Sequence, residues 1–94
     1  MKVYDYILFV DGLFGKNRKP RTEVFDLAKD QMKPLTLEQV TELYQKKIAS
    51  LNLRGKVSLK VTEQPCETEN MGGYTSKQFM LFTDKQLIKE TINV

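Results

Sequence analysis

Residues 35–51, LTLEQVTELYQKKIASL, decide the fold. Thr36 is a favourable N-cap residue, and Gln39 stands at the reciprocal position of a capping box. Glu38 falls in the first turn, where the positive end of the helix dipole favours an acidic side chain. Apolar side chains recur at helical spacing along the stretch, at Leu37, Val40, Tyr44, Ile48 and Leu51. The segment therefore predicts an amphipathic helix from about residue 37 to residue 51 that packs on a sheet.

Three further segments have strand patterns. Residues 3–10 are apolar on both faces, as is the run 79–82 within a strand expected at 74–83, and such runs are typical of strands inside a sheet. The pair Asp11-Gly12 is expected to end the first strand with a turn. Residues 56–62 alternate instead, which predicts a strand with one face in water, and its apolar positions are Val57, Leu59 and Val61.

Two segments fit a helix and a strand equally well. Thr22 can cap a short helix through residues 22–33, but residues 23–27 also suit a strand that returns from a loop. The last residues, 84–94, can form a short C-terminal helix with Leu87, Ile88 and Ile92 inward, or an edge strand. Both alternatives stay open at this point.

The size of the chain predicts one small α+β domain over residues 1–94. Its 94 residues, 40% hydrophobic and 29% charged, have ordinary globular composition and suffice for one core. We expect a three- to four-stranded, largely antiparallel sheet with the helix at about 37–51 packed on one face. A short C-terminal helix belongs to this fold only if residues 84–94 form a helix and not an edge strand.

The sequence also predicts a cytoplasmic location. No stretch approaches the roughly 20 apolar residues of a membrane helix, and Asp5 and Asp11 bracket the apolar N-terminal run too tightly for a signal peptide. Cys66 is the single cysteine, so no intrachain disulfide can form. We expect it in a loop, as a thiol without a functional role.

Nothing in the sequence indicates catalysis. The chain has no histidine, which removes the commonest general base and the commonest metal ligand. Glu67 beside Cys66 disfavours a reactive thiolate. The spacing of Asp5, Asp11 and Asp84 does not resemble a metal site. We therefore expect a protein that is not an enzyme, with no catalytic residue, cofactor or metal.

Charge is segregated along the chain, although the formal net charge is only +3. A loop expected at residues 13–21, the basic loop, carries the cations Lys16, Arg18, Lys19 and Arg21. A second acid-free stretch carries Lys46, Lys47, Arg54, Lys56 and Lys60, which helix C-termini and wet strand faces attract in any case. A loop expected at about 64–73, the acidic loop, contains Glu67 and Glu69 and has no basic residue.

These patches predict a small non-enzymatic binding protein that occupies the surface of a macromolecular partner, as regulators, inhibitors and accessory subunits do. We expect the partner to be another protein, with a homodimer as a further alternative. Tyr and Met in a polar setting are typical contact residues. The expected contact residues are Lys16, Arg18, Lys19, Arg21, Glu67, Glu69, Met71 and Tyr74.

One local motif points toward nucleic acid. Residues 8–13, Leu-Phe-Val-Asp-Gly-Leu, resemble the first-strand motif of RNA-recognition-motif domains, in which an aromatic side chain on the open sheet face stacks on a base. The run 79–82 occupies the place of that family's third-strand motif, and the order strand, helix, strand, strand is similar as well. The sequence departs from the family at Gly12, where Asn is preferred, and at Lys77 and Gln78, which replace a Gly-aromatic pair.

The resemblance implies the alternative function, an RNA or single-stranded DNA binding module that uses the basic loop and an open sheet face. Its binding residues are Phe9, Lys16, Arg18, Lys19 and Arg21.

Overall fold

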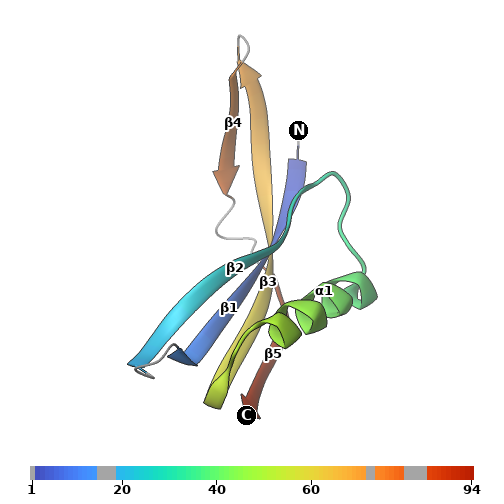
Figure 1. The fold of residues 1–94 in the computed structure, drawn as a ribbon. Helices are drawn as coiled ribbons and strands as arrows, with labels where there is room; N and C mark the ends of the chain where they lie inside the picture. Colours follow the sequence, from blue (N-terminus) through green and yellow to red (C-terminus); the bar gives the residue numbers. More distant parts are fainter. Residues whose placement is uncertain (1, 15–18, 72–73, 80–84) are drawn as a thin grey trace.

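The computed structural model describes residues 2–14, 19–71, 74–79 and 85–94, with the backbone alone at 13–14, 19–20, 69–71 and 74–79. The elements are β1 (Lys2–Phe14), β2 (Lys19–Gln31), α1 (Leu37–Ser50), β3 (Arg54–Met71), β4 (Tyr74–Phe79) and β5 (Lys85–Asn93). All strand pairs are antiparallel. Figure 1 shows α1 lying across one face of the sheet. The predicted α+β fold is confirmed.

The sheet has the order β2-β1-β3, and two strands pair with the edge of β3 that faces away from β1. β5 pairs with residues 56–63 of β3, and β4 pairs with residues 66–71. Beside α1 the sheet is therefore four strands wide, β2-β1-β3-β5. The β3–β4 hairpin continues beyond this part of the sheet, at the end remote from the C-terminus (Figure 1).

α1 forms where its local signals predicted it. The Thr36 side chain accepts a hydrogen bond from the Gln39 backbone N–H at 3.2 Å, and the Gln39 side chain accepts one from the Thr36 N–H at 2.9 Å, so both halves of the capping box are present. The helix ends at Ser50, and Leu51 is its C-cap.

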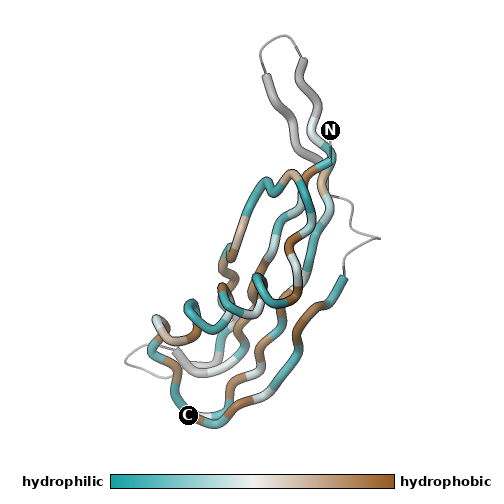
Figure 2. Tube along the Cα trace, turned by 90° about the vertical axis from the view of Figure 1, so that its right-hand side faces the viewer, coloured by the Kyte–Doolittle hydropathy of each residue, from teal (hydrophilic) through white to brown (hydrophobic). Residues whose placement is uncertain are grey.

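The core lies between α1 and the sheet face that α1 covers. Alternate residues of the central strands point to this face, because side chains along a strand alternate between its two faces. Figure 2 shows apolar stretches on the strands that α1 covers. The buried core side chains are Tyr6, Leu8, Val10, Val40, Tyr44, Leu53, Val57, Leu59 and Val61.

Residues 22–33, which fitted two structures, belong mainly to strand β2. Phe25 lies opposite Leu8 of β1, and Phe25 and Leu27 pack against the core. The pairing has bulges near Tyr6. Close to them the Asp30 backbone has φ 56°, and its N–H donates a hydrogen bond of 3.0 Å to the buried Asp5 carboxylate. Along the chain, β2 comes between β1 and α1. The element order expected from the RNA-recognition-motif resemblance, in which a helix follows the first strand, is therefore wrong.

The predicted turn at Asp11-Gly12 is wrong, because β1 continues to Phe14. Gly12 instead allows a close approach between strands. A Cβ atom at this position would lie only 3.0 Å from Val57 Cγ2.

The predicted acidic loop is also wrong, because β3 runs without interruption through residues 64–71. Pairing with β1 extends to Lys2 and Glu67, and β4 continues the sheet from there. Pro65 lies between the β5-paired and β4-paired parts of β3, a position that a residue without an N–H can occupy. Cys66 is in this strand and fully buried, so its placement in a loop was wrong as well.

The C-terminal segment is strand β5, so the alternative of a short C-terminal helix is wrong. Ile88 and Ile92 lie opposite Val61 and Val57 of β3 and pack against the core. The strand predicted at 74–83 is present as β4 up to Phe79, and residues 80–83 lie outside the described residues. In the described part of the chain, no helix has the length and apolar character needed to cross a membrane.

Candidate functional site

The described members of the two predicted charged patches lie at opposite ends of β1. Lys19 and Arg21 of β2 lie opposite Phe14 and Gly12, whereas Glu67 of β3 lies opposite Lys2. These described residues do not form one continuous patch.

The side chains of most predicted contact residues are not described. Lys16 and Arg18 lie outside the described residues, and only the backbone is described for Lys19, Glu69, Met71 and Tyr74. Of the remaining two, Glu67 is exposed on β3, and Arg21 is exposed on β2 with its Nε atom 2.7 Å from Glu23 Oε1.

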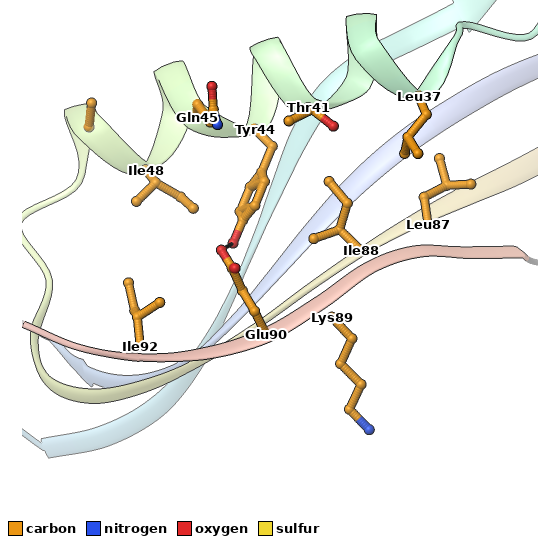
Figure 3. A pocket seen from close by; sticks show the side chains of 11 residues that line it. Leu37, Thr41, Tyr44, Gln45, Ile48, Leu87, Ile88, Lys89, Glu90 and Ile92 are labelled. Carbon is orange, nitrogen blue, oxygen red and sulfur yellow. Dashed lines mark hydrogen bonds between the residues drawn. The ribbon is translucent and has the colours of Figure 1, made fainter.

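A groove between α1 and β5 has a volume of about 630 Å³. Leu37, Tyr44 and Ile48 of α1 face Ile88, Glu90 and Ile92 of β5 across it (Figure 3). We call this surface the α1–β5 groove.

The α1–β5 groove has an apolar rim and one polar contact inside. The exposed fraction of Leu37 is 59%, and Ile48, Ile88 and Ile92 are each half-buried. The Tyr44 hydroxyl donates a hydrogen bond to the Glu90 carboxylate. Burial raises the pKa of Tyr44, and the hydrogen bond to Glu90 raises it further, since both disfavour the phenolate.

β5 is an edge strand in the part of the chain that the structure describes, since its only partner there is β3. Val94 and Gly55 exchange both of their backbone hydrogen bonds, at 2.9 Å each. Hydrogen-bonded and non-hydrogen-bonded pairs alternate along an antiparallel ladder. The backbone N–H groups of Lys89, Thr91 and Asn93 therefore point outward, away from β3.

The opposite face of the sheet carries Phe9, the aromatic residue of the nucleic-acid alternative. Four residues lie in register across four strands of this face, Val24, Phe9, Lys60 and Lys89. We call them the open-face row. Phe9 is half-buried and outside the core, and Lys60 Nζ lies 4.8 Å from the centre of its ring. Phe9, Lys60 and Lys89 of the row line a cavity of about 350 Å³.

Sequence reasoning missed the α1–β5 groove and half of the open-face row. The spacing of Ile88 and Ile92 was visible, but it fitted a helix as well as a strand. The alternation of residues 56–62 places Lys60 on a wet strand face, where a lysine is ordinary, and no sequence pattern links it to Lys89. Among the described residues, no group of three or more Cys, Asp or Glu side chains can hold a metal ion.

No protein-family model matches the chain, and no curated protein or solved structure shows significant similarity to it.

Proposed function

We propose that this protein is a small non-enzymatic binding protein that acts by occupying the surface of a protein partner. The partner contributes an extended segment that pairs with the outer edge of β5 and places alternate side chains in the α1–β5 groove. The observation that carries this proposal is the position of a half-exposed apolar groove directly beside an edge strand.

The backbone of β5 supports the proposal. An edge strand presents free N–H and C=O groups that an extended peptide can pair with, and side-chain pockets beside the edge then select the sequence. The outward N–H groups of Lys89, Thr91 and Asn93 supply such a row of donors. An added strand would lie about 4.8 Å from β5.

The groove favours apolar side chains on the partner strand. A strand paired with β5 directs every second side chain toward the α1 side of the sheet, where Leu37 and Ile48 stand. The Glu90 carboxylate inside the groove disfavours an anionic ligand. The partner is therefore an extended protein segment with apolar residues at alternate positions. We place this binding protein in the cytoplasm, where the buried Cys66 thiol stays reduced.

The test selects linear peptides from a phage-displayed library on the purified protein and measures their affinity by calorimetry. Thr91→Pro removes an outward N–H group and keeps the β3–β5 ladder, because edge strands accept proline at such positions. Thr91→Ala is the matched control. We expect Thr91→Pro and Leu37→Ser each to lower the affinity about tenfold, which is about 1.4 kcal/mol, and Thr91→Ala to leave it unchanged.

Three outcomes would overturn the proposal. The first is a library that yields no binding peptide, and the second is peptides that bind wild type and Thr91→Pro equally well. The third is a wild-type homodimer that Thr91→Pro converts to a monomer in sedimentation experiments, because a second copy then occupies the edge of β5.

A further inference from the structure

We propose that the sheet face opposite α1 holds a second binding site, which takes single-stranded nucleic acid and is centred on Phe9, Lys60 and Lys89 of the open-face row. This site lies on the opposite face of the sheet from the α1–β5 groove. Lys89 and Glu90 of β5 border both cavities, but the Lys89 side chain points away from the groove (Figure 3).

Two lysines lie opposite each other in this row at an energetic cost. The alternation that starts at the hydrogen-bonded pair Gly55–Val94 makes Lys60–Lys89 a non-hydrogen-bonded pair. Side chains come closest in such pairs, and like charges directly opposite each other are destabilising. A bound phosphate group removes this repulsion.

Phe9 supplies an aromatic ring next to the two cations. The ring is half-buried and outside the core cluster, with Lys60 over it. A base can stack on the ring when the exposed Lys60 side chain moves to a phosphate. Neighbouring strands are about 4.8 Å apart, so Lys60 and Lys89 stand about 5 and 10 Å from Phe9 across the sheet. Both cations are within reach of phosphates that flank a base on Phe9.

The residues around the open-face row favour binding of a polyanion over β3 and β5. Ser58 and Thr91, beside Lys60 and Lys89, provide hydroxyl groups at the same cavity. Asp11 of β1 lies opposite Ser58 and lines the same cavity, and Asp26 is exposed on β2. The cations of the row stand on β3 and β5, so a polyanion is directed toward these two strands and away from the carboxylates on β1 and β2.

The ligand is single-stranded, because Phe9 can stack only on a base that has left its duplex. Aromatic rings beside cations bind single strands with little sequence preference, since every base has a flat face. Binding also weakens as salt rises, because each phosphate contact releases a counterion.

The experiment measures fluorescence anisotropy of labelled oligouridylate and oligothymidylate at low and at physiological salt. We expect Lys60→Glu and Lys89→Glu each to weaken binding tenfold or more. Phe9→Ala removes the stacking platform and should weaken it about five- to 150-fold. Phe9→Leu keeps an apolar side chain of similar size and should weaken binding as well, so it replaces Phe9→Ala if that variant does not fold.

Lys47→Glu is the matched control. Lys47 Nζ lies 4.6 Å from the ring centre of Phe25, which packs against the core on the α1 side of the sheet. This variant changes the net charge as much as Lys60→Glu and also removes a cation from a phenylalanine ring. We expect it to bind the oligonucleotides like wild type.

The thermal stability of Lys89→Glu distinguishes loss of binding from loss of fold. This variant places a glutamate opposite Lys60 in a non-hydrogen-bonded pair, where side chains come close together. We therefore expect its Tm to rise while its affinity for oligonucleotides falls.

The proposal is overturned by the absence of binding to both oligonucleotides at low salt. It is equally overturned if Lys47→Glu loses as much affinity as Lys60→Glu, or if both Phe9 variants bind like wild type. Tighter binding to polyglutamate than to either oligonucleotide would assign the row to an acidic protein and would also overturn it.

Discussion

Tyr6 connects three separate parts of the chain through one buried hydroxyl group. The hydroxyl of this β1 residue donates a hydrogen bond of 2.7 Å to Glu63 Oε2 on β3 and accepts one of 2.7 Å from the Leu35 backbone N–H before α1. Burial and the bond to Glu63 raise the pKa of Tyr6 to about 12 from its usual value of 10.0. The neutral phenol therefore stabilises the folded state.

We expect Tyr6→Phe to lower the free energy of unfolding by about 1–3 kcal/mol at neutral pH, because it leaves the Leu35 N–H without its acceptor. Tyr6 binds its proton more tightly in the folded protein than in the unfolded chain. Its contribution to the free energy of unfolding is therefore complete below pH 10 and is lost as the pH rises toward 12. Urea titrations from pH 8 to 12 should show the gap between wild type and variant narrowing above pH 10. A gap independent of pH would refute this role, and Tyr4→Phe is the control.

At the level of elements, α1 is the element whose own residues explain where it begins. Thr36 and Gln39 satisfy two of the backbone N–H groups that a helix start leaves free. β3 differs, because it owes its length to partners on both edges, β1 on one side and β5 followed by β4 on the other.

Thr36→Ala should lower the free energy of unfolding by about 0.5–2 kcal/mol, since the Gln39 N–H loses the acceptor that it has at 3.2 Å. Thr36→Ser keeps a hydroxyl group and should lose much less. Chemical denaturation followed by circular dichroism measures both variants. Equal losses in the two would mean that the threonine methyl group, and not the cap, matters.

In the whole molecule, the sheet separates two candidate binding surfaces. The α1–β5 groove lies on the face that α1 covers, and Phe9, Lys60 and Lys89 lie on the other face. The proposed protein segment and the proposed nucleic-acid strand are thus assigned to opposite faces of the sheet, with Lys89 and Glu90 of β5 at the border of both cavities.

The fully buried Cys66 reports on the opening of the whole sheet. We expect a thiol reagent to label native protein slowly, at a rate set by unfolding equilibria. Leu59→Ala, a truncation in the core, should cost about 2–5 kcal/mol and accelerate labelling strongly. Fast labelling of the native wild type, or no acceleration in Leu59→Ala, would place Cys66 in a segment that opens independently of the core.

The predictable elements are those whose signals are local. The capping residues and the apolar spacing of residues 35–51 act within a few turns, and the alternation of Val57, Leu59 and Val61 acts within one strand. The local signal of residues 84–94 is ambiguous, because the spacing of Ile88 and Ile92 suits both a helix and a strand. Residues 64–71 have a loop-like sequence because Pro65 and the acids have low strand propensity, and pairing with β1 up to Glu67 and with β4 from Cys66 onward overrides it.

The amino-acid sequence alone determined the α+β class, the position of α1 and the apolar face of residues 57–61, because patterning and capping are short-range effects. The tertiary structure decided the long-range pairing, and with it both candidate sites. Lys60 and Lys89 come together only through the register of β3 and β5, and Ile88 meets α1 only because the C-terminal segment extends the sheet. Such register depends on which edges are free after the other strands have paired, and no local pattern contains that information.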